Sequence, residues 1–208
     1  MAPRGHHAER RDRATENELK FQVGGPRDHA RIADALREQG AKRAGAYDEE
    51  NFRFEGPAKT TRSVTLRLRV FDGGPKAVLT AKGPARFQGG VKIREETEVE
   101  VTDSRAMLDI LALLGFRTFV VYRKHRVHWS LGEDVIVTLD RLEYGWFVEV
   151  EGPLGVIPEV ALSLGLDPST ALKDSYSVLA LKYLAKSKKQ ARRHAQAAAA
   201  LAALPDEP

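Results

Sequence analysis

The sequence predicts a mainly β protein of the α+β class, a closed eight-stranded antiparallel β-barrel with helices packed outside. Three observations lead to this prediction. Segments of the chain alternate polar and apolar residues with the period of two that gives a strand two unlike faces. Charged residues of both signs occupy one face of nearly every such segment, and three amphipathic segments have helical spacing instead. The predicted strands are residues 16–23, 46–54, 62–70, 77–83, 91–101, 119–129, 135–142 and 145–152.

The three amphipathic segments are predicted to be helices. Residues 27–39 stop at Gly40 and residues 103–114 stop at Gly115, and glycine commonly follows the last turn of a helix. The third helix is expected over residues 168–185. Their apolar stripes favour packing against the apolar face of the sheet over ligand binding.

One folded domain accounts for most of the 208 residues. We expect residues 1–15 to form a disordered basic arm, because they lack apolar periodicity. The folded domain spans residues 16–185, and residues 186–208 form a basic, alanine-rich tail that can be helical. With no cysteine, the chain has no thiolate metal site. No apolar run approaches the roughly 18 residues of a membrane span and no secretory leader is evident, so we expect a cytoplasmic protein with no membrane partner.

Abundant charge of both signs is the feature that the composition leaves to be explained. Lysine and arginine number 33 against 29 aspartate and glutamate, so the net charge is only +4. Sorting each strand by alternation places seven acidic and seven basic residues on one face. The acidic residues are Glu16, Glu18, Glu96, Glu98, Asp140, Glu149 and Glu151, and the basic residues are Lys20, Arg67, Arg69, Lys82, Arg94, Lys124 and Arg126.

This charged face has two interpretations. A single strand of this kind is typical of an antiparallel sheet with one face in water. The whole set favours a closed barrel, because arginine forks suit phosphate oxygens and Glu-x-Glu pairs supply the hard oxygen ligands that Mg²⁺ or Mn²⁺ prefers. Burying so many charges without a ligand would be very costly. The sequence therefore predicts a solvated tunnel that holds metal ions and a polyanion.

A non-enzymatic barrel that captures polyphosphate or RNA is the alternative of another class. Aromatic residues make up only 7% of the chain, which argues against base stacking on single-stranded nucleic acid. We therefore expect no specific nucleic-acid partner. The Glu-x-Glu pairs would repel phosphate unless metal ions intervene, and this favours catalysis over simple capture.

The order of short motifs along residues 16–184 resembles the CYTH superfamily, the triphosphate tunnel metalloenzymes. The motifs are Glu16-Asn17-Glu18-Leu19-Lys20, Leu66-Arg67-Leu68-Arg69, Leu79-Thr80-Ala81-Lys82-Gly83-Pro84, Arg94-Glu95-Glu96-Thr97-Glu98, Lys124-His125-Arg126, Leu139-Asp140, Glu149-Val150-Glu151 and Ser175-Tyr176. The resemblance implies an eight-stranded tunnel that needs Mg²⁺ or Mn²⁺. It implies metal ligation by Glu16, Glu18, Glu149 and Glu151, with Glu96 or Glu98, and phosphate binding by the seven basic residues. It implies catalytic roles for Lys82, Lys124, Arg126 and Asp140.

The spacing of the later motifs is most similar to the class IV adenylyl cyclase branch, which implies conversion of ATP to cyclic AMP and pyrophosphate. Inorganic triphosphatase and thiamine triphosphatase are the alternatives, with tripolyphosphate or thiamine triphosphate as substrate, and a homodimer is allowed for. Asn51 stands where family members often carry tyrosine. In hydrolases that tyrosine can pair with the lysine that matches Lys82, so its role is in doubt here unless Tyr47 replaces it.

Three other patterns in the sequence do not indicate a functional site. His125 and His128 are three residues apart on one strand and so point to opposite faces, where they cannot share a metal ion. His6 and His7 lie in the predicted arm. Gly73-Gly74-Pro75-Lys76 lacks P-loop spacing and is predicted to be a hairpin turn.

Overall fold

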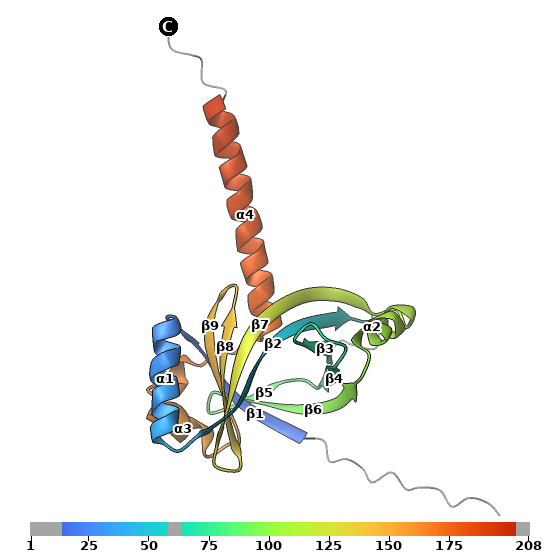
Figure 1. Cartoon of the computed structure of the whole chain (residues 1–208). Helices are drawn as coiled ribbons and strands as arrows, with labels where there is room; N and C mark the ends of the chain where they lie inside the picture. Colours follow the sequence, from blue (N-terminus) through green and yellow to red (C-terminus); the bar gives the residue numbers. More distant parts are fainter. Residues whose placement is uncertain (1–13, 58–63, 203–208) are drawn as a thin grey trace, which may run out of the picture.

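A computed structural model describes residues 14–57 and 64–202 (Figure 1). Its elements follow the predicted order, with two short additions and one displaced helix. They are β1 (Ala14–Val23), α1 (Pro26–Glu38), β2 (Lys42–Glu55), β3 (Thr65–Phe71), β4 (Ala77–Lys82), β5 (Arg86–Gln88), β6 (Val91–Val101), α2 (Ser104–Leu113), β7 (Arg117–Leu131), β8 (Val135–Leu142), β9 (Gly145–Glu151), α3 (Ile157–Ser163), the 3₁₀ turn η1 (Pro168–Thr170) and α4 (Tyr176–Ala202).

Eight of the strands close into an antiparallel barrel, which confirms the predicted fold class. The hydrogen-bonded order runs β1-β9-β8-β7-β2-β3-β4-β6, and a further pairing of β1 with β6 joins the two ends. The register of that closing pair sets Glu16 opposite Arg94 and Glu18 opposite Lys92. Closure leaves no free edge along these eight strands, and it turns one face of the sheet into an enclosed interior.

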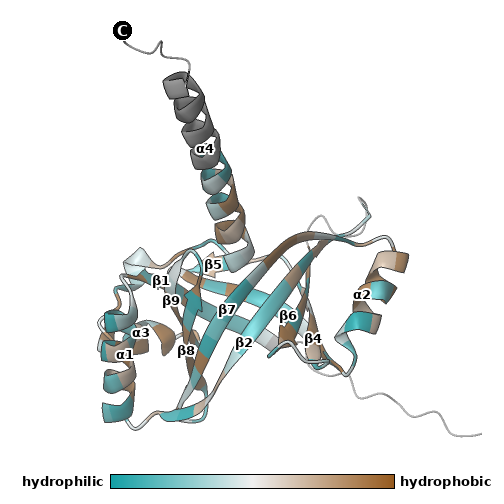
Figure 2. Cartoon of the chain, turned by 45° about the horizontal axis from the view of Figure 1, so that its top comes forward, coloured by the Kyte–Doolittle hydropathy of each residue, from teal (hydrophilic) through white to brown (hydrophobic). Residues whose placement is uncertain are grey.

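The outward, apolar face of the sheet is covered by helices on separate sides of the barrel (Figure 2). On one side, Ile32 and Leu36 of α1 and Ile157 of α3 pack with buried residues of β1, β8 and β9. On the other, Leu111 of α2 packs with buried residues of β2, β3, β4 and β6. A third cluster lies on the inner face, where Tyr176 at the base of α4 packs with Tyr122 and Phe147. Helices α1, α2 and α3 thus cover the outer face, and the base of α4 packs against the interior.

The helix ends follow from the residues that cap them. The Asp103 carboxylate accepts hydrogen bonds from the backbone N–H groups of Arg105 and Ala106, both at 3.0 Å, at the start of α2. Gly40 follows α1 with φ of 77° and Gly115 follows α2 with φ of 83°, a left-handed conformation that glycine adopts without a steric penalty. Both predicted helix ends are therefore confirmed.

The third predicted helix begins in the wrong place. Residues 168–170 form only η1, and α4 starts at Tyr176 and runs through the alanine-rich stretch to Ala202, so the predicted helical character of that stretch is confirmed. Figure 1 shows α4 projecting away from the barrel. Helix α3 and strand β5 were missed because both are shorter than the windows in which periodicity is visible. The predicted arm falls almost wholly outside the described residues.

Two smaller expectations are met. Gly73 has φ of 65° in the tight turn between β3 and β4, as the hairpin prediction requires. His125 lies on the outer surface with Nδ1 2.8 Å from Asp48, whereas the pKa of His128 is lowered by burial and by the charge of Arg126. His6 and His7 lie outside the described residues. No helix in the described part of the chain is long and apolar enough to cross a membrane.

Candidate metal and anion-binding site

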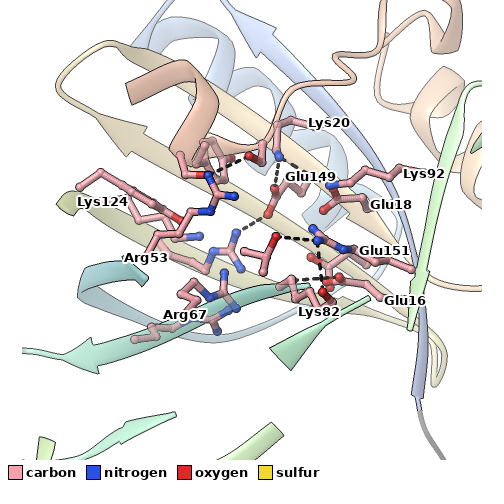
Figure 3. A pocket seen from close by; sticks show the side chains of 18 residues that line it. Glu16, Glu18, Lys20, Arg53, Arg67, Lys82, Lys92, Lys124, Glu149 and Glu151 are labelled. Atoms are coloured by element: carbon pink, nitrogen blue, oxygen red, sulfur yellow. Dashed lines mark hydrogen bonds and ion pairs between the residues drawn. The ribbon is translucent and has the colours of Figure 1, made fainter. Parts of the chain in front are cut away.

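The barrel encloses a cavity that is partly open to solvent and whose walls are charged (Figure 3). Eight strands contribute to the barrel, so inward side chains from distant parts of the sequence meet there. All seven basic residues that the alternation pattern predicts for this face line the cavity: Lys20, Arg67, Arg69, Lys82, Arg94, Lys124 and Arg126. Four of the seven predicted acidic residues line it as well: Glu16, Glu18, Glu149 and Glu151.

Strand register brings three of these acids together. The β1–β9 pairing sets Glu18 directly opposite Glu151, and Glu16 lies two residues before Glu18 on the same face. One carboxylate oxygen from each of Glu16, Glu18 and Glu151 lies within 4.8 Å of the other two. Burial raises the pKa of Glu151 to about 8, and the neighbouring charges of Glu16 and Glu149 add to this shift. Crowded oxygen donors of this kind fit a hard divalent cation such as Mg²⁺ or Mn²⁺.

Glu149 faces cations instead of this acidic trio. Its carboxylate lies 3.1 Å from Lys20 Nζ and accepts a hydrogen bond from Arg126. Burial opposes its ionisation, but the charges of Lys20, Arg126 and Lys124 hold the pKa of Glu149 well below its ordinary value. In this arrangement Glu149 orients the basic residues, and the predicted metal ligand lies beside the trio without being part of it.

The two predicted acids on β6 differ in depth. Glu96 contacts Lys82 and shares a hydrogen bond with Glu16, and burial together with that bond raises the pKa of Glu96 to about 8. Burial also opposes ionisation of Glu16, yet the bond with Glu96 and the charge of Lys82 hold the pKa of Glu16 at about 2. Glu98, with a side chain 48% exposed, accepts from Thr80 at 2.7 Å and lies 3.8 Å from Arg67. Glu98 is therefore apart from the acidic trio.

Asp140 is paired with Arg126 on the inner face of the barrel and is fully buried. It accepts hydrogen bonds from Arg126 Nε at 2.7 Å, from the Tyr176 hydroxyl at 2.8 Å and from Lys124 Nζ at 3.3 Å. The Tyr176 ring in turn lies under two ammonium groups, 4.3 Å from Lys20 Nζ and 5.0 Å from Lys124 Nζ. Asp140 and Tyr176 thus fix three of the basic residues that face the cavity.

Glu49 was missed by the sequence analysis. Its side chain is fully buried on β2, 3.4 Å from Lys124 Nζ and 3.6 Å from Arg69 Nε. Burial opposes its ionisation, but the charges of Lys124, Arg69 and Arg126 hold the pKa of Glu49 at about 2. The signal was present in the sequence, because Glu49 alternates with Asn51 and Arg53 along the strand.

Two tyrosines lie near Asn51, and only one of them lines the cavity. The Asn51 side chain is fully buried and donates to Glu49 at 3.1 Å. Tyr122 on β7 is paired opposite Asn51 and lines the cavity, and it shares its alternation with Lys124. Tyr47 packs its ring edge against Phe71, 5.4 Å between centroids, and is not among the described residues that line the cavity. Tyr122 is therefore a tyrosine of the interior that the sequence analysis overlooked.

Other residues of the cavity wall were also missed. Arg53 pairs in register with Arg67, and its Nε is buried with no hydrogen-bond partner. Lys92 donates to Glu18 at 2.5 Å. Ser175 and Ser177, whose hydroxyls are 2.9 Å apart, enter from the start of α4. Alternation places Arg53 and Lys92 on the charged face, and Ser175 belongs to the Ser175-Tyr176 motif, but none of the three was predicted to be a site residue. Ser177 carried no signal of its own in the sequence.

A closed antiparallel barrel, with a carboxylate trio and a basic lining inside it, defines the tunnel class of β-barrel proteins. The chain belongs to the CYTH domain family, whose match covers residues 14–162. One relative, "Putative adenylate cyclase MJ0240" of Methanocaldococcus jannaschii, is 30% identical over 145 residues, which cover 69% of this chain and 80% of the relative.

Solved structures share the fold. The PH1012 protein of Pyrococcus horikoshii is 27% identical with a TM-score of 0.67, and the match covers 79% of this chain and 98% of that one. HpAC1 from Hippeastrum is 22% identical with a TM-score of 0.57, and the match covers 76% of this chain and 92% of that one. HpAC1 is described as an adenylyl cyclase candidate with a dominant triphosphatase activity.

Proposed function

We propose that the tunnel binds a triphosphate together with divalent metal ions, and that the protein is an enzyme similar to class IV adenylyl cyclases that converts ATP to cyclic AMP and pyrophosphate. The observation that carries this proposal is the position of the acidic trio, Glu16, Glu18 and Glu151, in a cavity otherwise lined by lysine and arginine. The name of the relative from Methanocaldococcus jannaschii supports the choice of reaction.

Metal ligands and phosphate ligands divide the wall between them. Glu16, Glu18 and Glu151 would hold a divalent ion, which neutralises phosphate charge and lowers the pKa of a bound hydroxyl. Lysine and arginine side chains around them bind phosphate oxygens and orient the chain of phosphates. Lys82, which lies 3.1 Å from Glu16, reaches both groups of ligands. Glu149 and Asp140 hold Arg126 in the orientation that the phosphates require.

Cyclisation needs the ribose 3′-oxygen in line with the α-phosphorus. The bond from that oxygen to phosphorus forms, the bond from phosphorus to the bridging oxygen of the β-phosphate breaks, and the hydroxyl proton passes to solvent. Pyrophosphate leaves with its charge matched by Lys124 and Arg126. The chain contributes position and charge, which account for most of the catalysis in phosphoryl transfer.

Triphosphate hydrolysis is the second candidate, because the same wall can place water against a terminal phosphorus. Tyr122 supplies a phenol inside the cavity where Asn51 does not. The activity described for HpAC1 favours the same reaction for that protein. A purely basic polyphosphate binder is the third, and it gives no account of three adjacent carboxylates.

Product analysis separates the two reactions. Purified protein is incubated with ATP or with tripolyphosphate in Mg²⁺ or Mn²⁺, and products are resolved by ion-exchange chromatography. Cyclic AMP and pyrophosphate from ATP are expected. Orthophosphate from tripolyphosphate, with no cyclic nucleotide from ATP, would show that the protein is a triphosphatase and not a cyclase.

A further inference from the structure

Strand β5 adds one aromatic side chain to the rim of the tunnel. It follows β4 and pairs with the start of β6, where Phe87 lies directly opposite Lys92. Lys92 is also directly opposite Glu18 on β1, on its other side. Directly paired residues of antiparallel strands have side chains on the same face of the sheet. Glu18, Lys92 and Phe87 therefore form one row on the inner face, across β1, β6 and β5.

This row connects the acidic trio to the rim. Lys92 Nζ donates to Glu18 at 2.5 Å, and its side chain is nearly buried. Neighbouring strands are about 4.8 Å apart, so Phe87 lies about 10 Å from Glu18 along the wall. Figure 1 shows β5 beside β6. Phe87 is 44% exposed, whereas Lys92 is covered.

The ring is held in place from two directions. Lys173, in the segment before α4, has its Nζ 5.8 Å from the centroid of the Phe87 ring. The β5–β6 turn consists of Gly89 and Gly90 with φ of 56° and 85°, and the backbone of Gly90 approaches the carbonyl oxygen of Pro168 in η1. An exposed aromatic ring thus lies outside the lining of the charged cavity, two strands from Glu18 and beside Lys173.

We propose that Phe87 is the stacking surface for the base of a nucleoside triphosphate, so that the protein selects nucleotides over inorganic tripolyphosphate. This inference rests on the proposed function, because it requires phosphates in the tunnel near Glu18. An α-phosphate at the acidic trio leaves the ribose directed to the rim, and the base then meets the Phe87 ring. Lys173 lies where it can contact the base edge or the ring. Stacking on one aromatic ring is tolerant of base identity, so discrimination between purines is not expected from Phe87 alone.

Equilibrium binding of two probes tests this proposal without cyclisation of the nucleotide, because the methylene bridge cannot leave from the α-phosphorus. Titration calorimetry with Mg²⁺ measures the Kd of α,β-methylene-ATP and of tripolyphosphate for the full chain, for Phe87→Ala and for Phe87→Trp. Phe87→Ala is expected to raise the Kd of the nucleotide probe about tenfold and to leave the Kd of tripolyphosphate within about twofold. Phe87→Trp keeps an aromatic ring and is expected to keep the wild-type Kd of the nucleotide probe. Leu113→Ala, which truncates an apolar side chain 88% exposed on α2, is the control and changes neither Kd.

Each outcome has a definite meaning. An unchanged nucleotide Kd in Phe87→Ala, or an equal rise for both probes, overturns the stacking role while the anion site stands. If wild type binds tripolyphosphate but binds α,β-methylene-ATP no more tightly, the stacking role is also overturned while the anion site stands. A wild-type chain that binds neither probe overturns the proposed function, and the inference is lost with it.

Discussion

Two kinds of carboxylate share the barrel interior, and they differ in what surrounds them. Glu49 and Asp140 are fully buried among lysine and arginine, so each is compensated by neighbouring cations. Glu16 and Glu18 each contact a lysine, Lys82 and Lys92, but they also face each other and Glu151, whose pKa is raised to about 8 by burial and by neighbouring carboxylates. The carboxylates paired with cations stabilise the fold. A bound metal ion would stabilise the crowded carboxylates most.

The first prediction at this scale concerns the crowded acids. Glu18→Gln and Glu151→Gln each remove one charged metal ligand and keep the side-chain shape. Loss of outer-shell partners alone costs metal sites about 10- to 100-fold, so turnover should fall by at least about 100-fold while phosphate binding by the arginines persists. The measurement is initial rate against Mn²⁺ concentration, with Glu98→Gln, outside the trio, as the control. Wild-type rates with unchanged metal dependence in both variants would contradict the assignment.

The second prediction concerns Glu49, whose pKa falls from 4.5 to about 2 in the folded chain. A depressed carboxyl pKa stabilises the fold fully above pH 4.5, and the contribution is lost as pH falls toward 2. The contribution of this pKa shift to the free energy of unfolding is on the order of 3 kcal/mol at neutral pH. Chemical denaturation of wild type and Glu49→Gln should therefore show a stability difference that narrows between pH 5 and 2. The exposed Asp34, changed to asparagine, is the control; a difference that stays constant with pH would rule out this account.

At the scale of elements, the sequence pattern predicted well which face of the sheet each charged residue occupies. It predicted poorly how deep in the tunnel each residue lies. Alternation identified all seven predicted basic residues of the cavity wall, because inward and outward side chains alternate without exception along a regular strand. It could not separate Glu96 from Glu98, which share a face, because depth along the tunnel depends on where each strand ends. Glu49 escaped notice because β2 carries charge on both faces.

Helix α4 was displaced for a related reason. Residues 171–175 lie between η1 and α4, and Leu172 N donates to Lys20 O at 2.7 Å, which ties this segment to β1. That tertiary contact is invisible in the local pattern of the sequence. It also places Ser175 and Tyr176 at the cavity, so the base of α4 is part of the site. The projecting end of α4 contributes none of the residues that line the cavity.

The prediction at this scale divides α4 into two parts. Ending the chain after Lys189 keeps the turns that pack on the barrel, so the thermal midpoint should stay within about 2 °C. Ending it after Ser175 removes Tyr176 and Ala180 from the core, and loss of a buried aromatic side chain alone costs about 3–5 kcal/mol, or about 10 °C for a domain of this size. Calorimetric melting of both shortened chains provides the test. Equal midpoints in the two would show that the base of α4 does not stabilise the barrel.

For the whole molecule, barrel closure is the step that converts a common pattern into a specific site. An open sheet with these residues would present its charges to water, where most surface ion pairs contribute little. The β1–β6 pairing encloses them, so that Lys82 and Glu16, 66 residues apart in sequence, lie 3.1 Å from each other. Closure was predicted from the density of charge of both signs. Individual contacts across the tunnel could not be, because they depend on the register between strands that are distant in the chain.

The most direct test of the central claim is the metal dependence of triphosphate binding by the whole chain. Tripolyphosphate is titrated by calorimetry in Mn²⁺ and again in excess chelator, with wild type and Glu151→Gln in parallel. The account predicts that wild type binds at least about tenfold more tightly with Mn²⁺, and that Glu151→Gln loses most of this gain while it keeps the binding seen in chelator. Equal affinity of wild type with and without metal would contradict the account and identify the barrel as a purely basic binder of polyphosphate.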